Sequence, residues 1–151
     1  MIFLAHPNPN DSPNCFKVAR ALEANTHQKL HDLEDDPSEI LKSIEAAEVV
    51  NIVYPVYNYS YPSRFKHFID NNIPRGAFKS KAIHIYRTHG MEDPSMPDSI
   101  ITNLHYKIDE IDKAVFGIYG GARSVEHTHL FGCMNQESSN MQEVLGSISG
   151  K

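Results

Sequence analysis

Short apolar segments alternate along this chain with longer segments of helical periodicity, and no other feature limits the possible folds as strongly. Met1–Ala5 is a continuous apolar run, which is typical of a strand covered by helices on both of its faces. The same reasoning predicts buried strands at Val49–Tyr54 and Ala82–Tyr86. A more polar edge strand is expected at Gln28–Leu33, and a fifth strand within Ala122–Cys133. The chain is therefore expected to be an α/β protein.

Helical periodicity fills the intervals between these strands. In five stretches, apolar residues recur at spacings of three or four: Phe16, Ala19 and Leu22; Ile40, Leu41, Ile44 and Ala47; Phe65, Phe68 and Ile69; Ile101, Leu104, Ile108, Ile111, Val115 and Ile118; and Met141, Val144, Leu145 and Ile148. Strands that alternate with helices through right-handed crossovers form an open parallel sheet. The sequence predicts one flavodoxin-like domain over residues 1–151, a doubly wound five-stranded parallel sheet with the strand order 2-1-3-4-5.

Composition narrows the class of function. The chain has 19 acidic and 14 basic residues and a formal net charge of −5, and the basic residues are scattered, which argues against nucleic-acid binding. No apolar run approaches the roughly 20 residues that a membrane span requires. Cys15 and Cys133 lie far apart in the sequence, which indicates reduced thiols and therefore a cytoplasm. The N-terminus lacks a signal-peptide pattern. We expect a cytoplasmic protein with no membrane span.

Ligands of doubly wound sheets bind outside the carboxyl ends of the strands, where the strand order reverses. The first loop there, HPNPNDSPN, lacks the glycines of a dinucleotide fingerprint and the GK[ST] of a triphosphate loop. His6, Ser12 and Asn14 instead offer donors beside a helix start, which suits a single terminal phosphate. A turn rich in Pro and Asn, with Ser12 as helix N-cap, would explain the same residues without a ligand.

Two further loops lie at the same edge. Pro55–Pro62 places three tyrosines within five residues after a buried strand. They would suit a packed surface, or a platform for a flat ring with loop N–H groups directed at its polar edge. Thr88-His89-Gly90 adds a hydroxyl, an imidazole and a flexible backbone position. The three loops together could bind one ligand by its phosphate, its ring and a polar edge.

HPNPNDSPN, followed later by VVNIVYPVYNYSYPSRFKHFID, resembles the flavodoxin-like NAD(P)H:quinone oxidoreductase family, particularly its short bacterial FMN-type members. The resemblance is close over the first 75 or so residues and looser beyond them. It implies a non-covalent flavin, FMN rather than FAD, bound in a homodimer whose active site lies at the subunit interface. It also implies NAD(P)H as a transient substrate and a small-molecule electron acceptor.

The resemblance also assigns flavin-binding residues by position. His6, Ser12 and Asn14 would hold the phosphate and the ribityl chain. The ring would be lined by Pro55, Val56, Tyr57, Asn58 and Tyr59, and by Thr88, His89 and Gly90, which stand at the family's T-[TS]-G-G position. Asn58 stands where the family usually has Trp, and the segment after Gly90 that carries a Tyr and a His in quinone reductases is shortened here.

These residues favour an FMN-dependent NAD(P)H oxidoreductase that passes hydride to a quinone-like acceptor, with the flavin supplying the chemistry in place of a catalytic side chain. Asn58 and the shortened segment leave open a flavin-binding or flavin-free regulatory subunit with the same fold. A one-electron carrier like flavodoxin fits less well, because HPNPNDSPN lacks the Gly, Ser and Thr of flavodoxin phosphate loops.

The sequence gives less support to other chemistries. His127 and His129 share a strand face, but a zinc site needs three or four converging ligands, so we expect no metal and place both at a sheet end or subunit contact. No G-x-S-x-G elbow supports a hydrolase. Asp109-Glu110 is typical of a solvated helix face, and Cys15 of a small buried residue.

Overall fold

The computed structural model describes residues 1–8, 13–90, 107–133 and 140–150. Five parallel strands form a sheet in the order β2-β1-β3-β4-β5, which confirms the predicted fold class and strand order. The strands are β1 (Ile2–Leu4), β2 (Leu30–Asp32), β3 (Val49–Pro55), β4 (Ala82–Thr88) and β5 (Ser124–Leu130). The fifth strand is thus shorter at both ends than the apolar pattern predicts.

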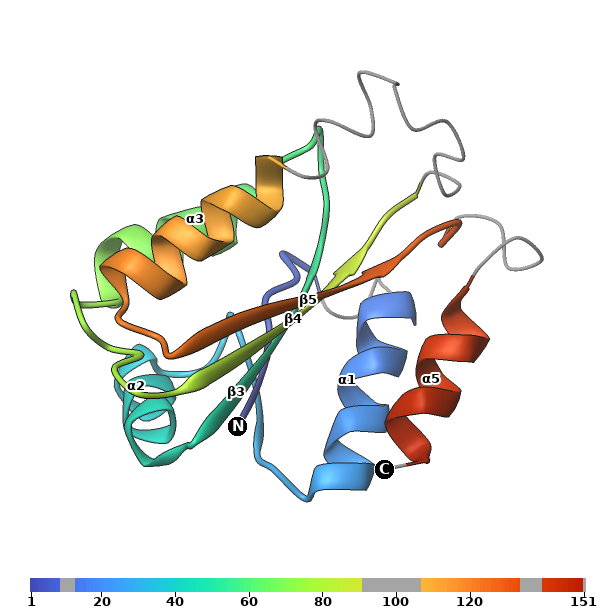
Figure 1. Ribbon diagram of the computed structural model, residues 1–151, viewed down its shortest axis with the longest axis horizontal. Helices are drawn as coiled ribbons and strands as arrows, with labels where there is room; N and C mark the ends of the chain where they lie inside the picture. The colour runs from blue at the N-terminus through green and yellow to red at the C-terminus, as the bar shows by residue number, and fades with distance from the viewer. Residues whose placement is uncertain (9–12, 91–106, 134–139, 151) are drawn as a thin grey trace.

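Helices cover both faces of the sheet (Figure 1). One face carries α1 (Pro13–Thr26) and α5 (Met141–Ser149), which lie side by side. The other face carries α2 (Pro37–Ala46), α3 (Ser63–Asn72) and the helical segment 107–119, whose second part is the π-helix η2 (Lys113–Tyr119). No helix of the described ranges is long and apolar enough to cross a membrane.

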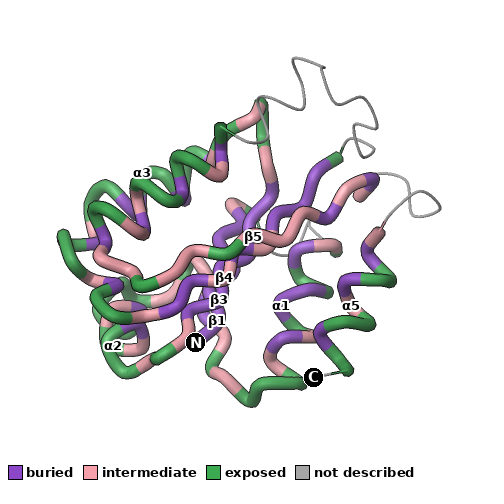
Figure 2. The backbone as a smooth tube through the Cα atoms, in the orientation of Figure 1, coloured by how far each residue is buried: buried purple, intermediate pink, exposed green. Residues whose placement is uncertain are grey.

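The core has two parts, one between the sheet and each helix layer, as expected for strands with apolar residues on both faces. Buried residues follow the strands and the sheet-facing sides of the helices (Figure 2). Phe3 packs towards α3, against Phe65 and Phe68 at ring-centroid distances of 5.8 and 5.1 Å. Ile2 and Leu4 pack instead with the buried residues of α1 and α5. Alternate residues of β1 therefore pack into opposite parts of the core.

Local sequence signals place the elements at the edge of the sheet. α2 begins at Pro37, because the Asp36 carboxylate accepts a hydrogen bond from the Ser38 N–H at 2.9 Å and Pro37 occupies the first turn. β2 contributes one buried side chain, His31, whose ring nitrogens lie 2.8 Å from Asp35 Oδ2 and 2.8 Å from Ser43 Oγ. β2 thus lies at an edge of the sheet, as its polar sequence predicted.

The segment before β5 departs from the predicted helical register. Ile108 is buried, but Ile111 is 47% exposed and Ile118 is 84% exposed, and Phe116 enters the core instead. For Phe116 and Ile118 the reason is the wide winding of η2, where the Gly120 N–H bonds to the Val115 carbonyl five residues back. A π turn shifts the later side chains around the helix, so a repeat of three and four no longer marks the buried face. Ile101 and Leu104, which the sequence places in the same helix, lie outside the described residues.

Candidate functional site

Loops from separate parts of the chain meet at the carboxyl ends of the strands. The Val56 N–H donates to the Thr88 carbonyl at 3.0 Å, which joins the loops after β3 and β4. Cys15 Sγ lies 3.0 Å from Thr88 Oγ1, which joins the start of α1 to the same point. Cys15 and Thr88 are both buried, and Cys15 is the small buried residue that the sequence predicted. The three predicted loops are therefore neighbours in space.

The first loop contacts the second through His6 and Tyr57. His6 Nδ1 accepts a hydrogen bond from the Asn8 N–H at 3.0 Å, so in the neutral ring the proton lies on Nε2. Nε2 lies 3.1 Å from the Tyr57 hydroxyl oxygen and donates to it. That leaves the Tyr57 hydroxyl hydrogen to donate to another group. Tyr57 is 46% exposed, and partial burial, followed by the Cys15 sulfur, raises its pKa, so the hydroxyl keeps its proton.

Asn14 has a partner within the protein. Its side-chain amide donates to the Cys133 carbonyl at 2.5 Å, which fastens the start of α1 to the loop after β5. The backbone N–H groups in the first turn of α1 have no partner within the helix itself, as in any helix start. Ser12, the other predicted phosphate ligand, lies outside the described residues.

The second loop forms a tight turn. Tyr57 and Ser60 exchange backbone hydrogen bonds of 3.2 and 2.9 Å, and the φ angles of Asn58 and Tyr59 between them are +47° and +58°. Asn is among the few residues that adopt this left-handed conformation readily, which gives a backbone reason for Asn58 where the family usually has Trp. The N–H groups of Val56, Tyr57 and Ser60 are all used within the protein. Of those predicted to face a ring edge, the Asn58 N–H has no hydrogen-bond partner among the described residues.

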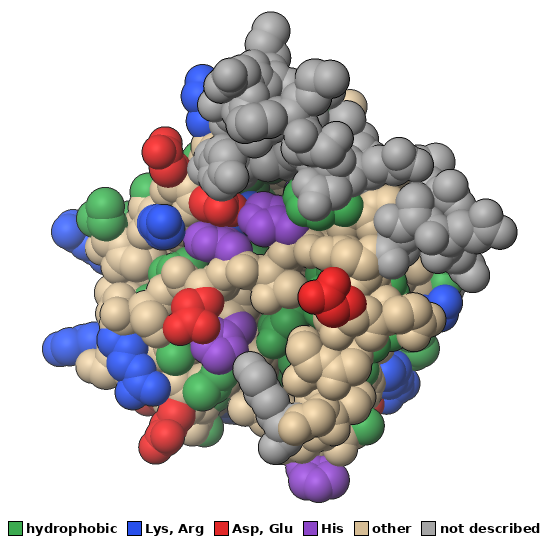
Figure 3. Space-filling model, turned by 45° about the vertical axis from the view of Figure 1, so that its right-hand side comes forward, with side chains coloured by type: hydrophobic (Ala, Val, Ile, Leu, Met, Phe, Trp, Pro, Cys, Tyr) green, Lys and Arg blue, Asp and Glu red, His purple; other side chains and the backbone are tan. Residues whose placement is uncertain are grey.

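His89 is held firmly in the third loop. Its N–H donates to the Leu130 carbonyl at 2.7 Å, and its carbonyl accepts from the Cys133 N–H at 2.9 Å. Its ring stacks on Phe131 at a centroid distance of 4.7 Å, and its Nε2 lies 3.0 Å from His129 Nδ1. Gly90 is exposed beside it. Figure 3 shows histidine side chains beside acidic ones on one face of the molecule.

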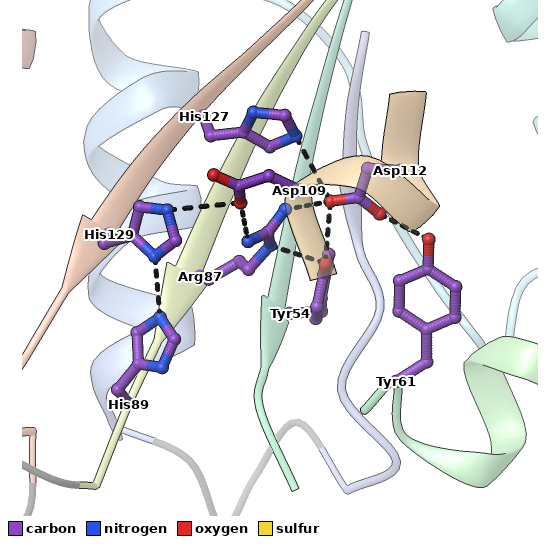
Figure 4. A network of polar contacts seen from close by, with 8 residues as sticks. All are labelled: Tyr54, Tyr61, Arg87, His89, Asp109, Asp112, His127 and His129. Atoms are coloured by element: carbon purple, nitrogen blue, oxygen red, sulfur yellow. Dashed lines mark hydrogen bonds and ion pairs between the residues drawn. The ribbon is translucent and has the colours of Figure 1, made fainter. Parts of the chain in front are cut away.

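Beneath these loops lies a buried charge cluster that sequence reasoning missed (Figure 4). Arg87, near the carboxyl end of β4, is fully buried and pairs with both Asp109 and Asp112. Its Nε donates to the Tyr54 hydroxyl at 2.7 Å, and that hydroxyl donates to Asp112 Oδ2 at 3.0 Å. The Tyr61 hydroxyl donates to the other oxygen of Asp112. The expectation of a solvated Asp109 is thus wrong.

The cluster sets the protonation of its members. Burial alone would raise the pKa of Asp109, but the hydrogen bond from His129 and the charge of Arg87 outweigh burial and hold that pKa well below its usual value. Burial, followed by the charge of Asp112, raises the pKa of Tyr54 and Tyr61 far above the usual value, so both stay neutral donors. An arginine inside the apolar strand AIHIYRT was the one sequence signal for this cluster.

The two histidines of β5 also face the cluster. His129 Nε2 lies 3.3 Å from Asp109 Oδ1, and His127 Nε2 lies 3.4 Å from Asp112 Oδ2. Their place at a sheet end agrees with the sequence prediction, but their partners are carboxylates of this chain. Among the described residues, no group of three His, Cys, Asp or Glu side chains is arranged to hold a metal ion.

Comparison with known proteins agrees with this architecture. The model of a family described as having a flavodoxin-like fold matches residues 1–145. The chain belongs to this family. Among curated proteins, none matches the sequence of this chain.

Solved structures with the same fold include several oxidoreductases. An NADPH-quinone reductase from P. pentosaceus is 15% identical, with a TM-score of 0.77 over 98% of this chain and 94% of that one. An FMN-dependent NADH-azoreductase from Bacillus anthracis, in complex with FMN, is 16% identical, with a TM-score of 0.67 over 99% and 94%. General stress protein 14 from Treponema denticola, also with FMN, is 19% identical, with a TM-score of 0.70 over 97% of each chain. At these identities the likeness establishes the fold.

Proposed function

We propose that this chain is a flavin-dependent NAD(P)H oxidoreductase that binds FMN and passes hydride from NAD(P)H to a quinone-like acceptor in the cytoplasm. The observation that carries the proposal is the meeting of three loops at the carboxyl edge, through His6 with Tyr57, Val56 with Thr88 and Cys15 with Thr88. Family membership supports it, as do a quinone reductase and an FMN-dependent azoreductase among the similar structures.

The donors at this edge suit the parts of FMN. The N–H groups at the start of α1, with Ser12, would bind the phosphate. The Asn14 side chain and His6 would fix the surrounding loops, since both already bond to neighbouring loops. The Tyr57 hydroxyl and the Asn58 N–H would face the ring. The remaining residues around the ring would be Pro55, Val56, Tyr59, Thr88, His89 and Gly90.

Bound FMN would supply the two-electron hydride chemistry. The chain's part would be to hold FMN at the strand ends, within reach of NAD(P)H as the hydride donor and of the acceptor.

A regulatory subunit that uses the same fold without turnover is the second candidate. The internal pairing of the Val56, Tyr57 and Ser60 N–H groups favours it, because these donors are then not available to a flavin ring. Asn58 in place of Trp removes a large ring surface from the same turn.

Binding and turnover separate the two candidates. FMN is titrated into the purified protein and followed by its absorbance and fluorescence, with riboflavin, which lacks the phosphate, as the control ligand. Oxidation of NADH and NADPH is then measured with benzoquinone. FMN binding with turnover supports the oxidoreductase, and FMN binding without turnover supports the subunit. A protein that takes up no FMN refutes the proposed enzyme.

We also propose a homodimer, on the evidence of an apolar surface on segment 107–119. Ile111, Ile118 and Tyr119 are 47%, 84% and 52% exposed. Beside them lies a groove of about 340 Å³ lined by Ile69, Asp70, Ile73, Ala114, Val115 and Tyr119. Exposed apolar patches of this kind on small proteins mark contact sites, and a two-fold axis would cover the same patch on both subunits.

A further inference from the structure

One peptide group of the first loop is held at both of its ends. It joins Pro7 to Asn8 in the loop after β1. The Pro7 carbonyl accepts a hydrogen bond from Arg64 Nη1 at 2.7 Å, and the Asn8 N–H donates to His6 Nδ1 at 3.0 Å. A peptide group is planar, so fixing the direction of its carbonyl also fixes the direction of its N–H. Arg64 therefore sets which way the Asn8 N–H points.

The direction of this N–H decides which nitrogen of His6 carries the ring proton. With the Asn8 N–H on Nδ1, the neutral ring is protonated at Nε2. Nε2 lies 3.1 Å from the Tyr57 hydroxyl oxygen and donates to it, so the exposed Tyr57 directs its own hydroxyl hydrogen to another group. A turn of the Asn8 N–H away from the ring would permit the proton to lie on Nδ1, and the Tyr57 hydroxyl would then donate to Nε2. The peptide thus determines whether Tyr57 offers a hydrogen-bond donor to a ligand.

Arg64 is itself held from two sides. It lies in the first turn of α3, and the next residue, Phe65, is buried and packs against Phe3 at a ring-centroid distance of 5.8 Å. Arg64 Nη2 lies 2.6 Å from Glu34 Oε1, in the turn after β2. The guanidinium thus places one nitrogen on a carboxylate and the other on the Pro7 carbonyl, and the single nitrogen of a lysine does not reproduce this fork.

The same contacts contribute little to the stability of the fold. The side chains of Arg64 and Glu34 are 47% and 64% exposed, and exposed ion pairs add little to stability. A charged donor on one loop carbonyl can still select between two orientations of a single peptide. Substitution of Arg64 should therefore change the loop and leave the fold intact.

We propose that Arg64, held by Glu34, is a positioning residue of the cofactor site; this inference rests on the proposed function. Arg64 keeps the Pro7–Asn8 peptide in the orientation that places the His6 proton on Nε2. His6 then donates to the Tyr57 hydroxyl, and Tyr57 donates to a hydrogen-bond acceptor of the bound FMN. Arg64 thus acts on FMN binding through His6 and Tyr57.

The tautomer of His6 tests the first step without any flavin. Long-range proton–nitrogen NMR spectra of the isotope-labelled chain distinguish a ring protonated at Nε2 from one protonated at Nδ1. At a pH where the ring is neutral, the wild type should show the Nε2–H form alone, and Arg64→Gln should add the Nδ1–H form. The matched control is Lys66→Gln, because Lys66 lies on the same helix in an exposed pair with Asp70, and it should leave the tautomer unchanged. A wild-type tautomer in Arg64→Gln would overturn the proposal.

Flavin affinity tests the second step. Arg64→Gln should raise the Kd for FMN about fivefold, whereas Arg64→Lys, which retains a charged donor, should raise it less. Residues that act through one another are not additive, so Arg64→Gln in a Tyr57→Phe background should change the Kd by less than about twofold. Lys66→Gln should leave the Kd unchanged. An equal effect of Arg64→Gln in both backgrounds would exclude a role through Tyr57.

Two further results separate positioning from folding and from the proposed function. Urea unfolding of Arg64→Gln should match that of Lys66→Gln, since each variant loses one exposed pair. A much larger loss of stability in Arg64→Gln would assign Arg64 to the fold and contradict the proposal. Failure of the wild-type chain to bind FMN would refute the proposed function instead, and the His6 tautomer would still decide whether Arg64 orients the first loop.

Discussion

Removal of the Asp112 carboxylate should destabilise this protein more than removal of any surface charge. Asp112 and Arg87 are both fully buried, and Asp112 also accepts hydrogen bonds from Tyr54 and Tyr61. Breaking a buried ion pair by deleting one partner costs about 3–5 kcal/mol, because the other charge stays buried. Asp109 would still pair with Arg87 and moderate the loss, whereas two phenols would each lose their acceptor. We therefore expect Asp112→Ala to lower the free energy of unfolding by about 3–5 kcal/mol.

Urea unfolding followed by circular dichroism measures this change, because the chain contains no Trp to serve as a fluorescent probe. The loss corresponds to a fall in Tm of roughly 6–20 °C at 2–4 °C per kcal/mol. Asp70→Ala is the matched control, since Asp70, like Asp112, lies on a helix but its pair with Lys66 is exposed, and it should cost at most about 1 kcal/mol. A loss below about 1 kcal/mol for Asp112→Ala would refute the view that the buried cluster depends on this carboxylate.

Three further predictions concern the cofactor, the assembly and pH. Ser12→Ala combined with Asn14→Ala should weaken FMN binding at least tenfold while circular dichroism stays native, since the Ser12 donor to a charged group contributes on the order of 1.5–3 kcal/mol and Asn14 fastens the start of α1 to the loop after β5. An unchanged Kd would place the phosphate elsewhere. Light scattering should give about twice the 17.0 kDa chain mass, and Ile118→Glu should yield a folded monomer with reduced turnover; a wild-type monomer with full activity would refute the dimer. The pKa of Asp109 is lower in the folded than in the unfolded chain, so its stabilisation is complete above about pH 4 and is lost as pH falls below that value. In acid titrations, Asp109→Asn should therefore lose less stability than the wild type as the pH falls below 4. A decline as steep as that of the wild type would contradict the assignment.

The fold could be predicted because its determinants are local. Continuous apolar runs at β1 and β3, and amphipathic spacing in α2 and α3, are read directly from neighbouring residues. The strand order was predicted from the number of strands, because five strands favour the flavodoxin-like order 2-1-3-4-5. The three loops could be predicted for the same reason, because the fold alone brings the carboxyl ends of β1, β3 and β4 together.

The charge cluster could not be predicted because its partners are distant in sequence. Arg87 meets Asp109 across 22 positions, and Tyr54 meets Asp112 across 58. A carboxylate on a helix is usually solvated, and nothing near Asp109 in the sequence shows that an arginine lies opposite it. The exposed Ile118 was missed for a different reason, since a π turn has no distinct apolar repeat in a short segment.

The π-helix Lys113–Tyr119 also bears on how this chain tolerates changes in length. A π turn accommodates one residue more than an α turn at the same place. Deletion of Val115 would restore ordinary winding and rotate the following side chains by about 100° relative to the preceding turn. Phe116 would then leave its contact with Phe78, where the ring centroids lie 5.4 Å apart. The additional residue thus acts as a spacer: it keeps Asp109 and Asp112 in register with Arg87 while the chain still reaches the start of β5.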